Sequence, residues 1–172
     1  MRAALEFLYR ISGQLAGFFL VAIAVLSLAQ IGGRLLGFAA HSFDEFAGYC
    51  MAASSFLGLA YALRANEHIR MTLVLHHTRG RVRRGLEIAC LALGALLLGF
   101  FTWYACDMLW FSYTSQDVSQ GLLPVPLWIP QAGMAAGLAI LLLALLDDLA
   151  IAALGKTPSY DVAQAPPPAF ER

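Results

Sequence analysis

The sequence predicts an all-α membrane protein with four transmembrane helices, both termini cytoplasmic, and an interfacial segment between helices 2 and 3. Four apolar stretches, over residues 11–31, 46–63, 88–106 and 127–146, contain no Asp, Glu, Lys or Arg. About 20 helical residues cross the ~30 Å hydrocarbon layer of a bilayer. Only 13% of all residues are charged and the mean hydropathy is +0.70, whereas a soluble domain carries about 25% charged residues.

The positions of the cations predict the orientation. Ten of the eleven Lys and Arg residues precede the first stretch, lie between the second and third, or follow the fourth. Only Arg34 lies in another connection. Because cytoplasmic loops are enriched in Lys and Arg, we expect both termini and the central connection in the cytoplasm.

The first stretch follows a short N-terminal segment, residues 1–10, whose mixture of apolar and charged residues favours an interfacial helix. Gly32-Gly33 is expected to end the first transmembrane helix. Residues 18–26, followed by Ser27-Leu28-Ala29, also resemble a cleavable signal peptide. The region before them is long and contains Glu6, and the apolar run exceeds a typical signal core, which favours a retained helix.

The second stretch begins after Ser42-Phe43-Asp44-Glu45, which is typical of a capping box. Asp44 and Glu45 would also lie at the positive end of the helix dipole, which favours anions. Helix capping is their simplest role. An ion pair with Arg34 or with a partner subunit is the alternative.

The second helix is expected to end near Arg64. Residues 65–78 are too polar to cross a bilayer and too apolar to remain in water, so we expect them at the cytoplasmic interface, partly helical. Residues 79–84 include four arginines. Such a run anchors the topology and contacts anionic lipid headgroups.

The third helix is expected to start near Leu86 and can extend beyond Asp107. The fourth opens among prolines, and Pro130 is tolerated in a first turn because its nitrogen needs no acceptor there. Asp147-Asp148 would close that helix at its negative end, where acids are disfavoured. We therefore expect them to face a cation, either from the central connection or from another chain. Residues 155–172 have the composition of a disordered tail.

Small and polar residues inside the stretches predict helix packing. Gly13-x-x-x-Gly17 and Gly133-x-x-x-Gly137 repeat glycine four residues apart, which lets helix backbones approach closely in lipid. The partner helix can belong to this chain or to another one. The glutamines near the stretches are expected to form interhelical hydrogen bonds; they are Gln14, Gln30 and Gln131.

Several activities are disfavoured by what the sequence lacks. An ionisable residue at membrane depth usually marks an ion or substrate pathway, and the four stretches contain none, so we expect no transport by this chain alone. No histidine lies in a stretch, which disfavours a haem protein. Neither a metal-type spacing nor a nucleophile–base set is evident, so we expect no metal, no cofactor and no enzyme activity.

Zero net charge suggests no nucleic-acid partner. The three cysteines fit small buried residues; they are Cys50, Cys90 and Cys106.

Two segments carry a resemblance to a known family. Residues 56–70 place a glycine, Gly58, in the second stretch and then Arg64, His68 and Arg70. Residues 123–137 open the fourth helix with prolines before a glycine pair, and Asp44-Glu45 opens the second. Over most of residues 10–150 the chain resembles the small, DctQ-type membrane subunit of tripartite ATP-independent periplasmic (TRAP) transporters. Met71-Thr72 departs from the Val-Asp usual there, so no role of that acid is carried over.

This resemblance implies a subunit of a sodium-driven transporter for uptake of a small organic acid in a bacterial inner membrane. Its partners would be a large membrane subunit, a periplasmic solute-binding protein and membrane lipids. Residues 1–154 would form the small-permease domain, a scaffold for the large subunit. The alternatives are an autonomous four-helix channel or exporter and, less favoured, a membrane redox subunit.

Within this expectation, Arg64 and His68 would fix the cytoplasmic end of the second helix, inside the chain or against the large subunit. The full set of candidate docking or packing residues is Asp44, Glu45, Gly58, Arg64, His68, Arg70, Gly133, Gly137, Asp147 and Asp148.

Overall fold

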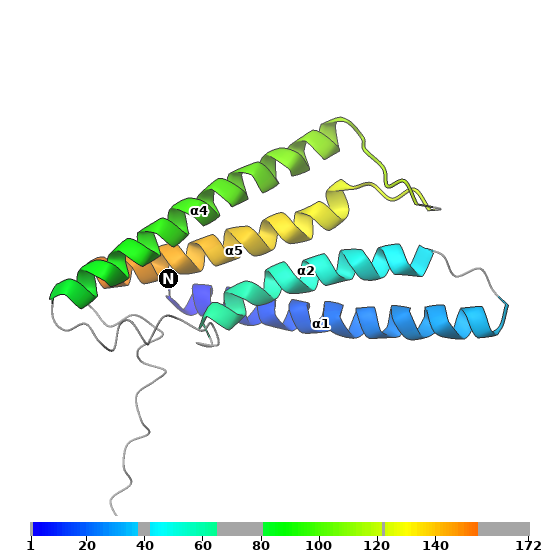
Figure 1. Ribbon diagram of the computed structural model, residues 1–172, viewed down its shortest axis with the longest axis horizontal. Helices are drawn as coiled ribbons and strands as arrows, with labels where there is room; N and C mark the ends of the chain where they lie inside the picture. Colours follow the sequence, from blue (N-terminus) through cyan, green and yellow to red (C-terminus); the bar gives the residue numbers. More distant parts are fainter. Residues whose placement is uncertain (1, 38–41, 65–80, 122, 155–172) are drawn as a thin grey trace, which may run out of the picture.

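The computed structural model describes residues 2–37, 42–64, 81–121 and 123–154. The described residues contain four helices, which Figure 1 shows as long rods that alternate in direction along the chain. They are α1 (Arg2–Leu35), α2 (Ser42–Arg64), α4 (Arg81–Thr114) and α5 (Trp128–Ala153). Each is long and apolar enough to cross a membrane, which confirms the predicted all-α class with four membrane spans.

The helices are longer than the charge-free stretches. α1 and α4 each contain 34 residues, about 51 Å at 1.5 Å per residue. Gly32-Gly33 does not end α1, which continues to Leu35, because glycine inside a helix costs only about 1 kcal/mol relative to alanine. The turn comes at Gly37, whose φ of +79° suits glycine and whose N–H donates to the Arg34 carbonyl.

α5 also runs past its predicted end. Asp147-Asp148 do not close it, because the Leu-Ala-Ile-Ala-Ala that follows is helix-compatible and carries the helix to Ala153. The N–H of Leu154 then donates to the Ala150 carbonyl. The acid pair therefore lies more than one turn before the C-terminal end of the helix. It is not at the negative end of the helix dipole, as the sequence had indicated.

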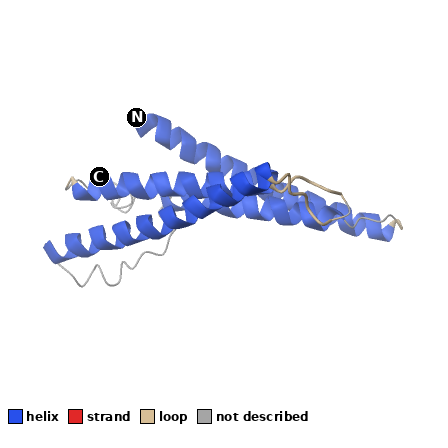
Figure 2. Ribbon diagram, turned by 90° about the horizontal axis from the view of Figure 1, so that it is seen from above, coloured by secondary structure: helices blue, strands red, loops and turns tan. Residues whose placement is uncertain are grey.

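The four helices form an open row in the order α1, α2, α5, α4 (Figures 1 and 2). α2 packs against α1 and α5, and α5 packs against α4, whereas α1 makes only marginal contact with α5. The outer members of the row are therefore less covered by their own chain. In the most apolar 18-residue window of each helix, 6% of the window is buried inside the chain in α1 and 39% in α5.

The row has two ends, which we name by what they carry. The terminal end holds the start of α1, the ends of α2 and α5, and the start of α4 (Figure 1). The distal end holds the α1–α2 connection and the connection between α4 and α5. The first and last helices thus begin and end at the same end, as four crossings require.

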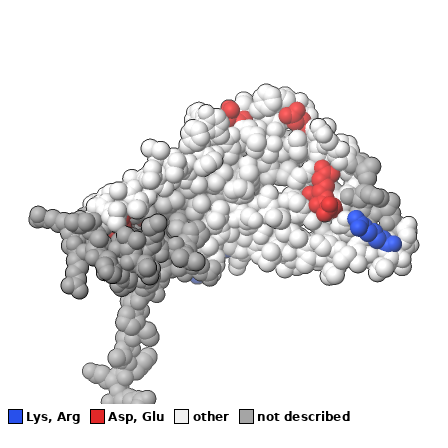
Figure 3. Space-filling model, in the orientation of Figure 1, with Lys and Arg blue, Asp and Glu red and all other residues white. Residues whose placement is uncertain are grey.

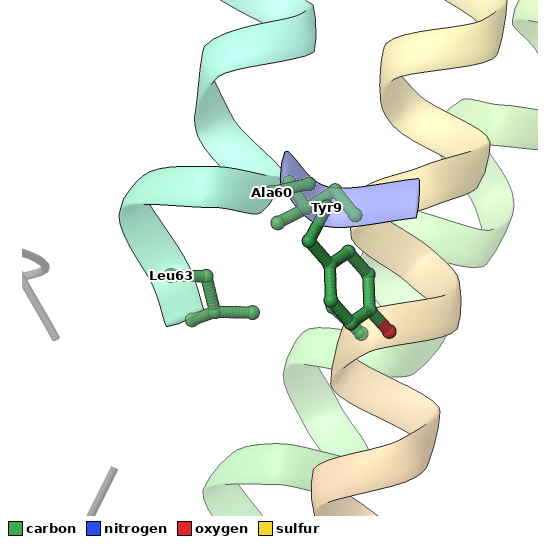
Figure 4. Packing of buried hydrophobic residues seen from close by; sticks show 5 residues of the cluster. Tyr9, Ala60 and Leu63 are labelled. Carbon is green, nitrogen blue, oxygen red and sulfur yellow. The ribbon is translucent and has the colours of Figure 1, made fainter. Parts of the chain in front are cut away.

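The packed interior consists of small clusters along the row. At the terminal end Tyr9 of α1 lies against Ala60 and Leu63 of α2 and against Leu141 and Ala144 of α5 (Figure 4). Two further clusters centre on α1–α2 and on α4–α5; their buried members are Ala16, Ala53, Leu57, Ala105, Ala135 and Leu138. Because alanine dominates, the helix backbones approach closely.

Some expectations fall outside the described residues. These include the interfacial segment over 65–78, the tail over 155–172, and two candidate site residues, His68 and Arg70. Arg64 is the last residue of α2.

Candidate functional site

The contact between α1 and α2 is held by two hydrogen bonds that run in opposite directions. The Ser12 hydroxyl of α1 donates to the Leu57 carbonyl of α2 at 2.5 Å, and the Ser54 hydroxyl of α2 donates to the Ala16 carbonyl at 2.9 Å. Ser12 is only 1% exposed. In lipid such bonds contribute modestly, about 0.6 kcal/mol on average, but they fix the register of the two helices. We name these four residues the serine clamp.

Sequence reasoning selected glutamines for interhelical hydrogen bonds and missed the two serines. Gln14 is exposed, because it lies on a different face of α1 from Ser12 and Ala16. The Gln131 Oε1 is buried and accepts no hydrogen bond from the described residues. The sequence signal that could have identified these hydrogen bonds was a serine facing small residues inside an apolar helix.

The first glycine motif contributes one residue to the α1–α2 contact. A Cβ added to Gly13 would lie 2.7 Å from the Tyr61 ring, whereas one added to Gly17 would meet nothing within 4 Å. On the α2 side, a Cβ at Gly58 would lie in ordinary contact, 3.6 Å from the Ala16 methyl. Gly13 and Gly58 thus lie at the contact and Gly17 does not.

The second glycine motif lies where α5 crosses α2. A Cβ at Gly137 would lie 2.5 Å from the Phe56 carbonyl carbon and 2.6 Å from its oxygen. One at Gly133 would lie 3.2 Å from the Ala53 methyl. The obstacle at Gly137 is backbone, which cannot move aside as a flexible side chain can. The motif thus brings α5 against α2 within this chain.

Asp148 is the most buried charged residue at the terminal end. It is 1% exposed and lies one helical turn beyond Ala144 of the Tyr9 cluster, while Asp147 is half-buried. Neither carboxylate is without an interaction. Trp128 and Asp148 are 20 positions apart in α5, about 30 Å along the helix axis, which equals the thickness of the hydrocarbon layer.

Asp148 is more deeply buried than its place after the last apolar stretch indicated. The sequence placed the acid beyond the last apolar stretch, at a helix end. The structure instead buries it within the chain, inside a helix that continues to Ala153. A carboxylate buried so fully requires charge or hydrogen-bond partners.

The distal end brings together Asp44 and Glu45 with the α4–α5 connection. Both acids lie in the first turn of α2, and Asp44 is exposed. The Tyr49 hydroxyl, one turn further along α2, donates to the Glu45 Oε1 at 2.5 Å. The backbone of Gly121 from the connection lies directly on the Glu45 carboxylate. Figure 3 shows acidic side chains, with basic atoms beside them, toward this end of the molecule.

The ten candidate residues therefore do not form one site. Gly58, Gly133 and Gly137 lie at contacts between helices, the acids of α2 lie at the distal end, and those of α5 lie near the terminal end. Across the part of the chain that is described, no three His, Cys, Asp or Glu residues converge on a possible metal position. The geometry provides contacts between helices rather than a chemical centre.

Comparison with protein families decides what kind of chain this is. Residues 4–154 match the family described as "Tripartite ATP-independent periplasmic transporters, DctQ component". The chain belongs to this family. No curated protein and no solved structure matched it.

The match extends over all four helices of this DctQ component, from the first turns of α1 to the residue after α5. It confirms the resemblance to the small membrane subunit of a TRAP transporter. Together with four spans of sufficient length, it makes the chain a multi-pass membrane protein of a transport system. The family is a transporter component and not a family of enzymes.

Proposed function

We propose that this DctQ component is a static scaffold for the large transport subunit of a sodium-driven TRAP transporter that takes up a small organic acid. The open helix row is the observation that supports this role. α1 and α4 stand at its two edges, and most of the α1 surface is left uncovered by its own chain. A single layer offers broad apolar faces to lipid and to a neighbouring membrane subunit without enclosing a path of its own.

The proposal includes an orientation and partners. The terminal end, where α1 begins and α5 ends, would face the cytoplasm of a bacterial inner membrane, since ten of the eleven cations precede the first apolar stretch, lie between the second and third, or follow the fourth. The distal end would face the periplasm, where a solute-binding protein delivers the substrate. The large subunit would carry the substrate and sodium sites, in keeping with the sparse ionisable groups of this chain.

Arg64 and His68 enter the proposal as residues that fix the terminal end of α2. Arg64 is the last residue of that helix, where a cation complements the negative end of the helix dipole. They would act either within the chain or against the large subunit.

Co-purification tests the assembly. The tagged DctQ component is produced together with the large subunit encoded beside it, and the amount of large subunit retained in detergent is measured. We expect stoichiometric recovery with the native chain and a clear loss for the double variant Arg64→Ala, His68→Ala. Gly17→Ala serves as control because that position has open space around it. Failure of the native chain to retain the large subunit would contradict the scaffold role, and unchanged recovery and uptake with the double variant would exclude these two residues.

A further inference from the structure

The connection between α4 and α5 is described over residues 115–121 and 123–127, and these two arms are paired with each other. The Ser119 N–H donates to the Val125 carbonyl at 2.8 Å, and the Leu127 N–H donates to the Asp117 carbonyl at 2.9 Å. These bonds pair the two arms of the connection in antiparallel fashion, with a bridge between Val118 and Pro126. The arms therefore hold each other and carry the tip of the first arm, Gly121, at a fixed place.

The tip lies on the start of α2. A Cβ added to Gly121 would overlap the Glu45 Oε2 and would lie 2.6 Å from the carboxylate carbon, so a residue with any side chain does not fit against this rotamer. Ser119, 7% exposed, lies within hydrogen-bonding reach of Glu45 and Tyr49. Its hydroxyl also donates to the Leu123 carbonyl at 3.2 Å.

The Glu45 carboxylate is itself held in position. The Tyr49 hydroxyl donates to its Oε1 at 2.5 Å, and the two residues lie one helical turn apart on α2. This bond fixes the rotamer of Glu45 so that its other oxygen faces Gly121. An added methyl group at residue 121 would therefore have to displace the Glu45 carboxylate and disturb its hydrogen bond with Tyr49.

This contact lies where the helix row is otherwise open. α5 is the helix that joins the α1–α2 pair to α4, and its closest approaches to α2 are at Gly133 and Gly137. Among the described helices, α4 makes no substantial contact with α1 or α2, and it diverges from α2 toward the distal end (Figure 1). Glu45 lies two turns beyond Ala53, the partner of Gly133.

We propose that the described part of this connection, residues 115–121 and 123–127, acts as a latch, in which Gly121 seated on Glu45 holds the distal ends of the α1–α2 pair and the α4–α5 pair at a fixed separation. Without the latch, the contacts between α2 and α5 run from Ala53 and Gly133 toward the terminal end, where Leu63 and Ala144 share one cluster. The latch adds an attachment beyond these contacts, at the distal end.

Distances between spin labels on the full chain in nanodiscs test the latch. In a background without the native cysteines, one label pair replaces the exposed residues Leu36 and Ser115 at the distal end, and a second pair replaces the exposed residues Phe7 and Leu154 at the terminal end. We expect Gly121→Ala to broaden the distal distance distribution about twofold and to leave the terminal one unchanged. Gly48→Ala is the matched control, because it lies in α2 with open space around it.

A second variant separates the contact from a general disturbance of the connection. Glu45→Ala removes the carboxylate that Gly121 meets, so it should itself broaden the distal distribution, while Asp44→Ala should not. In the Glu45→Ala background, adding Gly121→Ala should cause no additional broadening, because the two changes act on one contact. Equal broadening by Gly121→Ala in both backgrounds, or a native distribution in Glu45→Ala, would overturn the latch. If Gly121→Ala fails to insert, the comparison of Glu45→Ala with Asp44→Ala decides alone.

Discussion

Gly137 of α5 lies against the backbone of Phe56 in α2, so that a Cβ at residue 137 would be 2.5 Å from the Phe56 carbonyl carbon. The contact is the closest approach that the glycines of the second motif make. It lies in the middle of the row, where α2 and α5 join the two helix pairs. The packing of the two helix pairs against each other therefore depends on a glycine, because a residue with a Cβ would clash at this position.

Gly137→Ala should destabilise the chain by about 1–3 kcal/mol, the usual cost of forcing an extra methyl group into a packed contact. The reason is that the obstacle is the Phe56 main chain, which can give way only if the helices separate. Reversible unfolding in mixed micelles with increasing denaturing detergent measures this. Gly17→Ala, which meets open space, should leave the transition in place; equal stability of the two variants would contradict the assigned contact.

Loss of the serine clamp should weaken the α1–α2 contact. Ser12→Ala and Ser54→Ala each remove one side-chain donor to a backbone carbonyl of the facing helix, and each should cost about 0.6 kcal/mol, with an upper range near 1.7 kcal/mol. The same unfolding assay measures both. Ser115→Ala, at an exposed residue, is the control and should be neutral.

Asp148→Ala should be the most damaging of the single changes at the terminal end. Asp148 is buried and has an interaction partner, and leaving a buried polar partner unsatisfied typically costs about 1–3 kcal/mol, more where a charge is involved. Asp147→Ala, at the less buried neighbour, should cost clearly less. The yield of folded protein by size-exclusion chromatography and the unfolding transition report both; a greater loss with Asp147→Ala would contradict the burial seen for Asp148.

The features of the fold that could be predicted from the sequence are those that the hydrocarbon layer of the membrane imposes. Stretches without charge predicted four spans, since an unpaired charge in hydrocarbon is costly. Helix ends were predicted less well, because Gly32-Gly33 and Asp147-Asp148 would stop or destabilise a helix in water and are tolerated where neighbouring helices or lipid surround them. The expected roles of Arg64 as a docking residue and of His68 and Arg70 remain predictions.

The order of the helices could not be predicted from composition. Residues that face lipid, another helix or a partner subunit are all apolar, so exposed Val21 and buried Leu57 look alike in the sequence. The role of Gly121 could not be predicted either. Glycine is common in connections, and its contact with Glu45 joins residues that are far apart in the chain.

The central claim is that this chain supports transport without performing it, and uptake into liposomes tests it most directly. Labelled organic acid and an inward sodium gradient are supplied to vesicles with this chain alone, with the large subunit added, and with the solute-binding protein present as well. We expect sodium-dependent uptake only in the complete system and background levels with this chain alone. Robust sodium-driven uptake by the isolated chain would contradict the account.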